Sequence, residues 1–133
     1  MAGALVESFK VQATLATHRI VSHVTGTANT VQYHQTLTAL PIGVTVDTVL
    51  DTTSAIPVQL NGRAFVFFND TVTAGELVSG DTSGRGVPFS LAQTSTAISA
   101  PAAYLGLLIG PSVAATGTIA EVLIQPGFDR NAR

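Results

Sequence analysis

The sequence predicts an all-β fold, and three observations support this prediction. The chain is rich in Val, Ile and Thr, the β-branched residues that favour strands. Only 11% of its 133 residues are charged, against about 25% in an ordinary soluble domain, and strong helix formers such as Lys and Glu are scarce. Short β-branched runs also recur between Gly, Pro, Asn and Asp residues. A chain of this length can bury about two thirds of its surface, so we expect one domain, built as a small barrel or sandwich.

The N-terminal segment, residues 1–15, differs from the rest of the chain. It mixes Gly, Ala, Ser and Gln with isolated apolar residues, and it contains neither a capping box nor a full amphipathic stripe. We expect an extended arm rather than a helix, and a frayed terminus explains the composition equally well. Residues 16–127 are expected to form the β domain, and residues 128–133 a C-terminal tail.

The β-branched runs place the predicted strands in order along the chain. They are expected at residues 19–24, 31–33, 42–46, 56–60, 63–68, 76–78, 86–89, 104–109 and 118–125. Each run is bounded by residues that favour turns. No repeat of fixed period and no low-complexity linker divides them, so a single domain is expected.

A hairpin is predicted from residue 56 to residue 68, because the Asn61-Gly62 pair readily adopts the positive φ of tight turns. Its second arm alternates, with Ala64, Val66 and Phe68 on one face and Arg63, Phe65 and Phe67 on the other. Two phenylalanines are costly to leave in water, so both faces are expected to be covered. Phe65 and Phe67 are therefore candidate subunit-interface residues.

The C-terminal part of the chain has a long uncharged stretch that must be tested for membrane insertion. Residues 86–120 contain no charged side chain, and a spanning helix needs about 20 apolar residues. Pro101 and Pro111 interrupt the stretch, so two strands and a turn are expected, and no membrane partner. In the strand at 118–125, Glu121 stands among apolar neighbours. We expect it at a barrel rim or paired with an arginine.

The charge and cysteine content disfavour further function classes. The formal net charge is −2, and no cluster of Lys and Arg is present to bind a nucleic-acid backbone. Because the chain has no Cys, a disulfide scaffold and a thiolate zinc site are excluded. No secretory signal is visible, and production in a reducing cytoplasm is expected. We therefore expect no nucleic-acid partner.

The three histidines do not match the pattern of a metal site. His18 and His23 are five residues apart, which places them on opposite faces of a strand. No carboxylate lies within ten residues of these two or of His34 to complete a set of ligands. We expect all three to be ordinary surface or interface residues.

The remaining candidates for chemistry resemble turns. Residues 79–86 are rich in Gly and Ser, but they lack the ending of a phosphate-binding loop and the nucleophile elbow of a hydrolase. A polar turn is expected there, with Arg85 in solvent or reaching a carboxylate. Two carboxylate pairs are available, Asp47 with Asp51 and Asp70 with Glu76. Neither has the apolar or aromatic context of acid–base catalysis. We expect no catalytic residue, metal, cofactor or small-molecule substrate, and a structural or binding role.

The order of motifs across roughly residues 19–126 resembles one known family. The motifs are Arg19-Ile20-Val21, Ile42-Gly43-Val44-Thr45, Gly62-Arg63-Ala64-Phe65-Val66, Thr73-Ala74-Gly75-Glu76-Leu77-Val78, Asp81-Thr82-Ser83-Gly84-Arg85, Tyr104-Leu105-Gly106 and the strand at 119–124. This pattern of turn glycines and β-branched strands is similar to that of the capsid decoration, or cement, proteins of tailed bacteriophages. That family often has Asp where Glu76 stands.

The resemblance implies a β-barrel or β-tulip domain that binds the outer surface of the phage head as a homotrimer. Its partners would be the major capsid protein and copies of itself, and the bound trimer would bridge adjacent capsomers and stabilise the shell against internal DNA pressure. The N-terminal arm would add to the β-structure of the capsid protein. Its apolar anchors would be Leu5, Val6, Phe9 and Val11, with Glu7 and Lys10 as pairing charges.

Two other function classes fit the same composition. A head-fibre or adhesin-like module that binds a glycan or receptor would need exposed aromatic and polar side chains on its loops. A tail or connector component would be structural too, but it would form a ring. In all three classes the surface of the fold is the functional part.

Overall fold

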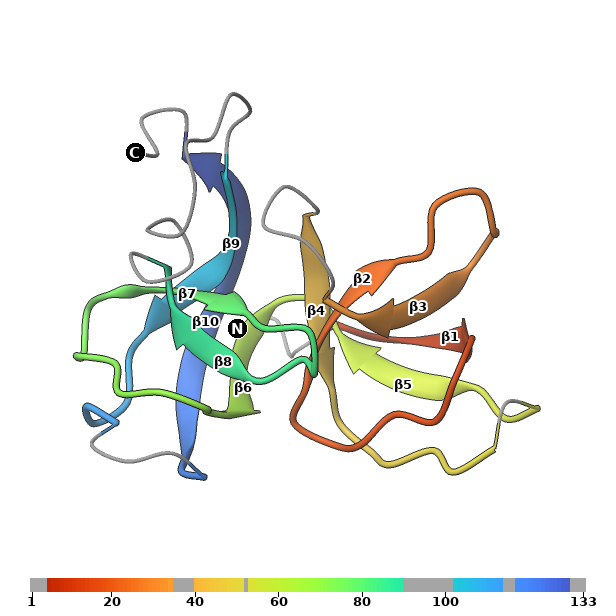
Figure 1. Cartoon of the computed structure of the whole chain (residues 1–133), viewed down its shortest axis with the longest axis horizontal. Coiled ribbons are helices and arrows are strands. Elements are labelled where there is room, and N and C mark those ends of the chain that lie inside the picture. The colour runs from red at the N-terminus through yellow and green to blue at the C-terminus, as the bar shows by residue number, and fades with distance from the viewer. Residues whose placement is uncertain (1–4, 35–39, 52, 90–101, 114–116, 130–133) are drawn as a thin grey trace.

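The computed structural model describes residues 5–34, 40–51, 53–89, 102–113 and 117–129, which form an all-β domain of two lobes (Figure 1). The first lobe is a closed barrel with the strand order β1-β3-β2-β4-β5, and the second is a sheet with the order β6-β10-β9-β7-β8. The strands are β1 (Val6–Val11), β2 (Ile20–His23), β3 (Thr30–Tyr33), β4 (Pro41–Thr45), β5 (Ile56–Gln59), β6 (Gly62–Phe67), β7 (Leu77–Gly80), β8 (Gly86–Pro88), β9 (Ala102–Leu108) and β10 (Ile119–Asp129). The prediction of an all-β domain containing a barrel is confirmed.

Strands β2 and β4 form a wall that is shared by two hydrophobic cores. Successive residues of a strand point to opposite sides, so Val21 enters the barrel while Ile20 packs beneath the second sheet. The barrel core also contains Val11, Leu15, Val31, Val49, Ile56 and Val58. The second core adds Val44, Ala64, Val66, Phe68, Val72, Val78, Leu105, Leu108, Val113, Ala120, Val122 and Ile124. The lobes therefore pack as one unit.

A β-bulge in β4 adjusts this wall. Val21 pairs with Gly43 and Ser22 pairs with Pro41, so Ile42 has no partner on β2. The extra residue shifts the alternation of side chains, which places Ile42 against the barrel core while Val44 joins the second core. Gly43 is required here, because a Cβ at this position would overlap the carbonyl oxygen of Gln59 on β5.

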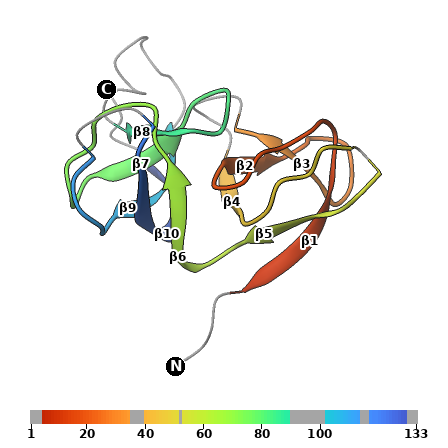
Figure 2. The same cartoon turned by 90° about the horizontal axis from the view of Figure 1, so that it is seen from below.

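The described part of the predicted N-terminal arm, residues 5–15, contains the extended strand β1 and belongs to the barrel. The first four residues of β1 pair with β5 in antiparallel fashion, and Lys10 and Val11 pair with β3 in parallel (Figure 2). Val11 and, just beyond the strand, Leu15 are buried in the barrel core. The predicted boundary at residue 15 is therefore wrong, because Phe9, Val11 and Leu15 of this segment pack in the chain's own barrel.

The C-terminal boundary also moves. Strand β10 continues to Asp129, so the first two residues of the predicted tail at 128–133 extend the strand opposite β9. Residues 130–133 lie outside the described part of the chain.

The predicted hairpin at 56–68 is wrong, although its turn forms. Gly62 has the expected positive φ of 76°, yet β5 pairs with β1 and β4 whereas β6 pairs with β10. The turn therefore joins the two lobes. The side-chain amide of Gln59 stabilises it by donating hydrogen bonds to the carbonyl oxygens of Asn61 (2.9 Å) and Arg63 (2.6 Å). Ala64 and Val66 lie in the second core, which holds β6 in the other sheet.

We expect deletion of residues 1–15 to unfold the barrel. The deletion removes β1, exposes the edges of β3 and β5, and takes two buried side chains out of the core, each worth about 2 kcal/mol. Circular dichroism should show loss of a cooperative thermal transition. The variant Glu7→Gln, at an exposed position of β1, should melt like the wild type. A truncated chain that retains the wild-type transition would contradict the role of β1 in closing the barrel.

Candidate functional site

The outward faces of β6 and β10 are apolar and partly exposed. The predicted alternation in β6 is confirmed, since Ala64, Val66 and Phe68 are buried and Phe65 is 54% exposed. Phe67, on the same face as Phe65, is half-buried, and the guanidinium of Arg19 lies over its ring at 4.9 Å from the centroid. Phe67 is thus covered within the chain, while Phe65 has its side chain in solvent.

Glu121 lies in the middle of this face and forms the predicted pair with an arginine. The Nη1 atom of Arg63 is 3.7 Å from Oε1 of Glu121. At this distance and exposure the pair contributes little to stability. It leaves both charged groups accessible at the surface of the sheet.

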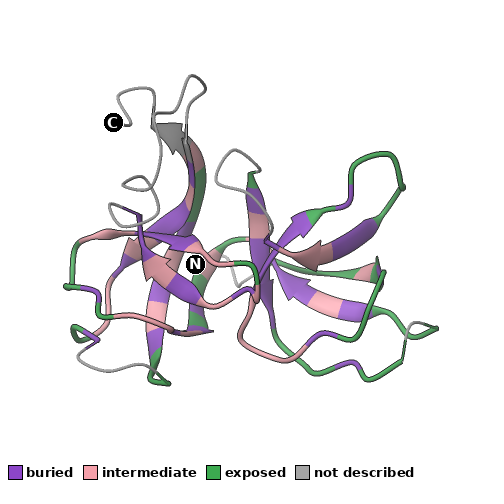
Figure 3. Ribbon diagram, viewed as in Figure 1, coloured by how far each residue is buried: buried purple, intermediate pink, exposed green. Residues whose placement is uncertain are grey.

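The six predicted capsid-binding residues divide into two groups. Leu5, Val6, Glu7 and Lys10 have exposed side chains, whereas Phe9 packs against the barrel core and Val11 is buried in it. Figure 3 shows β1 exposed along most of its length. Phe9 and Val11 therefore anchor the strand, and the other four residues can contact a partner.

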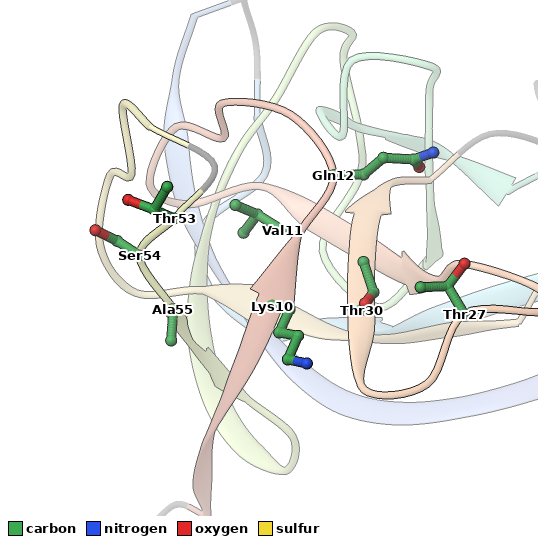
Figure 4. A pocket seen from close by; sticks show the side chains of 8 residues that line it. All are labelled: Lys10, Val11, Gln12, Thr27, Thr30, Thr53, Ser54 and Ala55. Atoms are coloured by element: carbon green, nitrogen blue, oxygen red, sulfur yellow. The ribbon is translucent and has the colours of Figure 1, made fainter.

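A groove of about 600 Å³ lies where β1 parts from β5. Phe9 is the last residue of β1 that pairs with β5, and the gap beyond it is lined by Lys10, Val11, Gln12, Thr27, Thr30, Thr53, Ser54 and Ala55 (Figure 4). The hydroxyls of Thr30 and Thr53 donate hydrogen bonds to Ala28 and Asp51. The groove thus offers a lysine and neutral polar groups.

The carboxylates that the sequence makes available as pairs each accept hydrogen bonds from neighbouring residues of a turn. Oδ1 of Asp51 accepts hydrogen bonds from the backbone N–H groups of Thr53 and Ser54 and from the Thr53 hydroxyl. These bonds, the Thr53 hydroxyl first, hold the pKa of Asp51 below its ordinary value. Other carboxylates accept a backbone N–H in the same manner: Asp47 from Thr48, Asp70 from Thr71 and Glu76 from Thr73.

The loop at 79–86 is a polar turn, as predicted. Asp81 organises it by accepting hydrogen bonds from the N–H groups of Ser83 and Arg85 and by pairing with Nε of Arg85 at 3.0 Å. Gly84 has a φ of 73°, which favours glycine. Arg85 thus reaches a carboxylate, one of the two expected outcomes.

The histidines differ more than the sequence indicates. His23 is exposed, and the carbonyl oxygen of His18 accepts a hydrogen bond from Phe67, which ties the barrel to β6. His34, predicted to be a surface or interface residue, is buried. Within the described residues no group of three or more His, Cys, Asp and Glu gathers as metal ligands.

His34 lies between the barrel and β7. Its Nδ1 is 2.9 Å from the hydroxyl of Ser22, and Gly80 packs against its ring. Its Nε2 is buried without a hydrogen-bond partner among the residues that the structure describes. Burial lowers its pKa to about 4, although the charge of Asp81 acts in the opposite direction. Sequence reasoning missed this residue because nothing in its local pattern distinguishes a buried histidine from an exposed one.

Comparison with solved structures places this geometry in a known context. The chain is similar in fold to the N base of head fiber gp8.5 of bacteriophage phi29, known from a crystal structure. The TM-score is 0.66 at 13% sequence identity, and the match covers 92% of this chain and 95% of that chain. At this identity the likeness shows a shared fold, and it includes both lobes.

Two other comparisons and a membrane test complete the picture. No protein-family profile matches the chain, and no curated protein matches it in sequence. Among the described ranges, no helix is long and apolar enough to cross a membrane.

We expect the stability of the protein to fall as the pH decreases from about 6.5 to about 4. In this pH range His34 is protonated in the unfolded chain and neutral in the folded chain, so the unfolded state binds more protons. The free energy of unfolding has its full value above about pH 6.5, and it falls by about 3 kcal/mol by pH 4. Urea unfolding at several pH values should show this slope. The pH dependence of stability should be smaller in His34→Gln and unchanged in the control His23→Gln. Equal slopes in both variants would contradict the conclusion that this pH dependence comes from His34.

Proposed function

We propose that this protein is a structural component of a tailed-phage head, bound as a trimer to the outer surface of the shell. The observation that carries the proposal is the fold similarity to the N base of a phage head fiber over nearly the whole of both chains. It agrees with the independent resemblance of the sequence to capsid decoration proteins. In this role the protein carries out no reaction, and its surfaces do the work.

The composition supports an assembled subunit. Only 11% of the residues are charged, and a surface with so few charges suits a protein that is covered by copies of itself and by a shell. Apolar side chains remain exposed on both lobes, Val6 on the barrel and Phe65 on the sheet among them. Separate faces are thus available for the shell and for other subunits.

We propose that the exposed side of β1 contacts the major capsid protein. Leu5 and Val6 supply apolar area, and Glu7 and Lys10 supply charges of opposite sign. Since β1 is held by β3 and β5, its backbone is already ordered, and little backbone entropy is lost on binding. Three such strands in a trimer would bind with avidity.

The proposed mechanism is mechanical. A trimer at a threefold position between capsomers would contact each of its neighbours through one β1. Separating the capsomers would then require breaking these contacts together, so the shell would resist the outward pressure of packaged DNA.

The base of a head fibre is the second candidate function. The similar fold is that of the N base of a head fiber, so a protein of this shape can belong to a fibre on a head. In that role, attachment to the shell would be the same, but the assembly would present a receptor- or glycan-binding part rather than reinforce the capsomers.

We expect the double variant Leu5→Ser, Val6→Ser to lose binding to heads. Each half-exposed apolar side chain contributes about 1 kcal/mol when buried, so the loss of six of them in a trimer of the double variant weakens binding about 10,000-fold. Co-sedimentation with heads of the phage that encodes the chain, stripped of this protein, measures the effect. Val46→Ser is a matched control, because Val46 is 41% exposed and Val6 is 45% exposed. Equal binding of the double variant would contradict contact through β1.

A second measurement separates the two candidate functions. If the protein is a decoration protein, heads that lack it should release DNA at a lower temperature, and adding the purified chain should restore the wild-type temperature. If it is a fibre base, head stability should be unchanged and adsorption to host cells should fall. Stable heads with normal adsorption would contradict both roles.

A further inference from the structure

The second sheet has an outer face that is apolar across four strands. The strand register places Leu123 of β10 beside Leu107 of β9, and Leu107 beside Leu77 of β7. Each of these leucines is half-buried, whereas the residue next to each of them, Val122, Leu108 and Val78, lies in the core. The three leucines therefore form a row on the side of the sheet that faces away from the barrel.

The most exposed large apolar side chains of the described part of this sheet lie beside this row. Phe65 on β6 pairs with Glu121, and Ile119, which is 46% exposed, pairs with Phe67. An antiparallel sheet with one face in water normally carries polar residues at these positions. Here the Arg63–Glu121 pair supplies the charges among apolar neighbours, so the sheet has the pattern of one covered on both faces.

The free edge of β6 is unsuited to adding a strand. The carbonyl oxygen of Arg63 accepts a hydrogen bond from the Gln59 side chain, and the N–H of Phe67 donates to the carbonyl oxygen of His18. A partner strand would have to break both bonds. Contact at β6 is therefore expected through side chains on the face of the sheet rather than through this edge.

We infer that this outer sheet face, comprising Phe65, Leu77, Leu107, Ile119 and Leu123 with the Arg63–Glu121 pair, is the interface between copies of this chain. The charges favour a second copy as the occupant. Arg63 and Glu121 give the face charges of both signs, and the Arg63 side chain is 68% exposed and only loosely held by Glu121. Around a threefold axis, each copy can place its Glu121 against the Arg63 of the next copy, so a face that carries both signs can join three subunits in a closed ring.

The inference deepens the proposed function by naming the surface that joins the subunits of the trimer. It also assigns the two exposed surfaces different partners, β1 for the shell and the outer sheet face for the neighbouring subunit. Phe65, the aromatic side chain that is 54% exposed on this face, is expected to contribute most to association.

Native mass spectrometry and sedimentation velocity of the purified full chain test the inference without any phage head. The wild type should be multimeric at about 10 μM, a concentration at which a micromolar interface is occupied. Phe65→Ser should be monomeric with an unchanged melting temperature. Leu50→Ser is the control, because Leu50 is 79% exposed on the barrel lobe and its loss should leave the multimer intact.

Two outcomes overturn the inference. One is a wild type that stays monomeric at 500 μM, which would leave the outer sheet face to another partner such as the shell. The other is a Phe65→Ser variant that associates as the wild type does. Neither result decides the proposed attachment to the shell, because that attachment is tested separately by the head binding of the β1 variants.

Charge reversal tests the complementarity of the face. Arg63→Glu and Glu121→Arg each place like charges together and should weaken association at least 10-fold at low salt. The variant carrying both changes restores opposite charges and should recover most of the wild-type association. Association that is unchanged in both single variants would overturn the pairing of Arg63 with Glu121 of the neighbouring copy.

Discussion

The whole structure depends on two strands, β2 and β4, that are buried on both sides. Ile20 and Val21 are adjacent, yet they belong to different cores, so neither lobe can be removed without exposing apolar surface of the other. Two polar side chains of this wall form hydrogen bonds: the Ser22 hydroxyl with Nδ1 of His34, and the Thr45 hydroxyl, which donates to the carbonyl oxygen of Ala16. Within the described residues, Nε2 of His34 and Nε of Arg19 are buried without this compensation.

The local elements of the fold could be predicted, but their partners could not. Alternation in β6 and the positive φ of Gly62 follow from residues close in sequence. The pairing of β1 with β5 and of β6 with β10 depends on which core each face fills, and this information is spread over the chain. The Asn61-Gly62 turn shows the difference. The positive φ of Gly62 can be predicted from the sequence, whereas the strands on either side of the turn belong to different sheets.

The candidate site was predicted in part for the same reason. The apolar face of β6 and the pairing of Glu121 with an arginine can be predicted, because the residue pattern of both strands is clear in the sequence. The division of the N-terminal residues into buried anchors and exposed contacts does not, because Phe9 and Val6 look alike until β1 is placed in the barrel. The burial of His34 likewise arises from the approach of Gly80 on a distant strand.

The order in which the strands pair has a consequence for synthesis on the ribosome. β1 is made early but cannot complete its ladder until Gln59 has emerged, whereas β6 must wait for β10, whose last residue is Asp129. The barrel can therefore close while the second sheet is still missing, with Ile20 and Val44 exposed on its outer wall. Such long-range pairing slows folding and leaves apolar surface uncovered for a time. Nascent chains on neighbouring ribosomes of one mRNA would therefore contact one another through this exposed wall before the surfaces of the folded protein have formed.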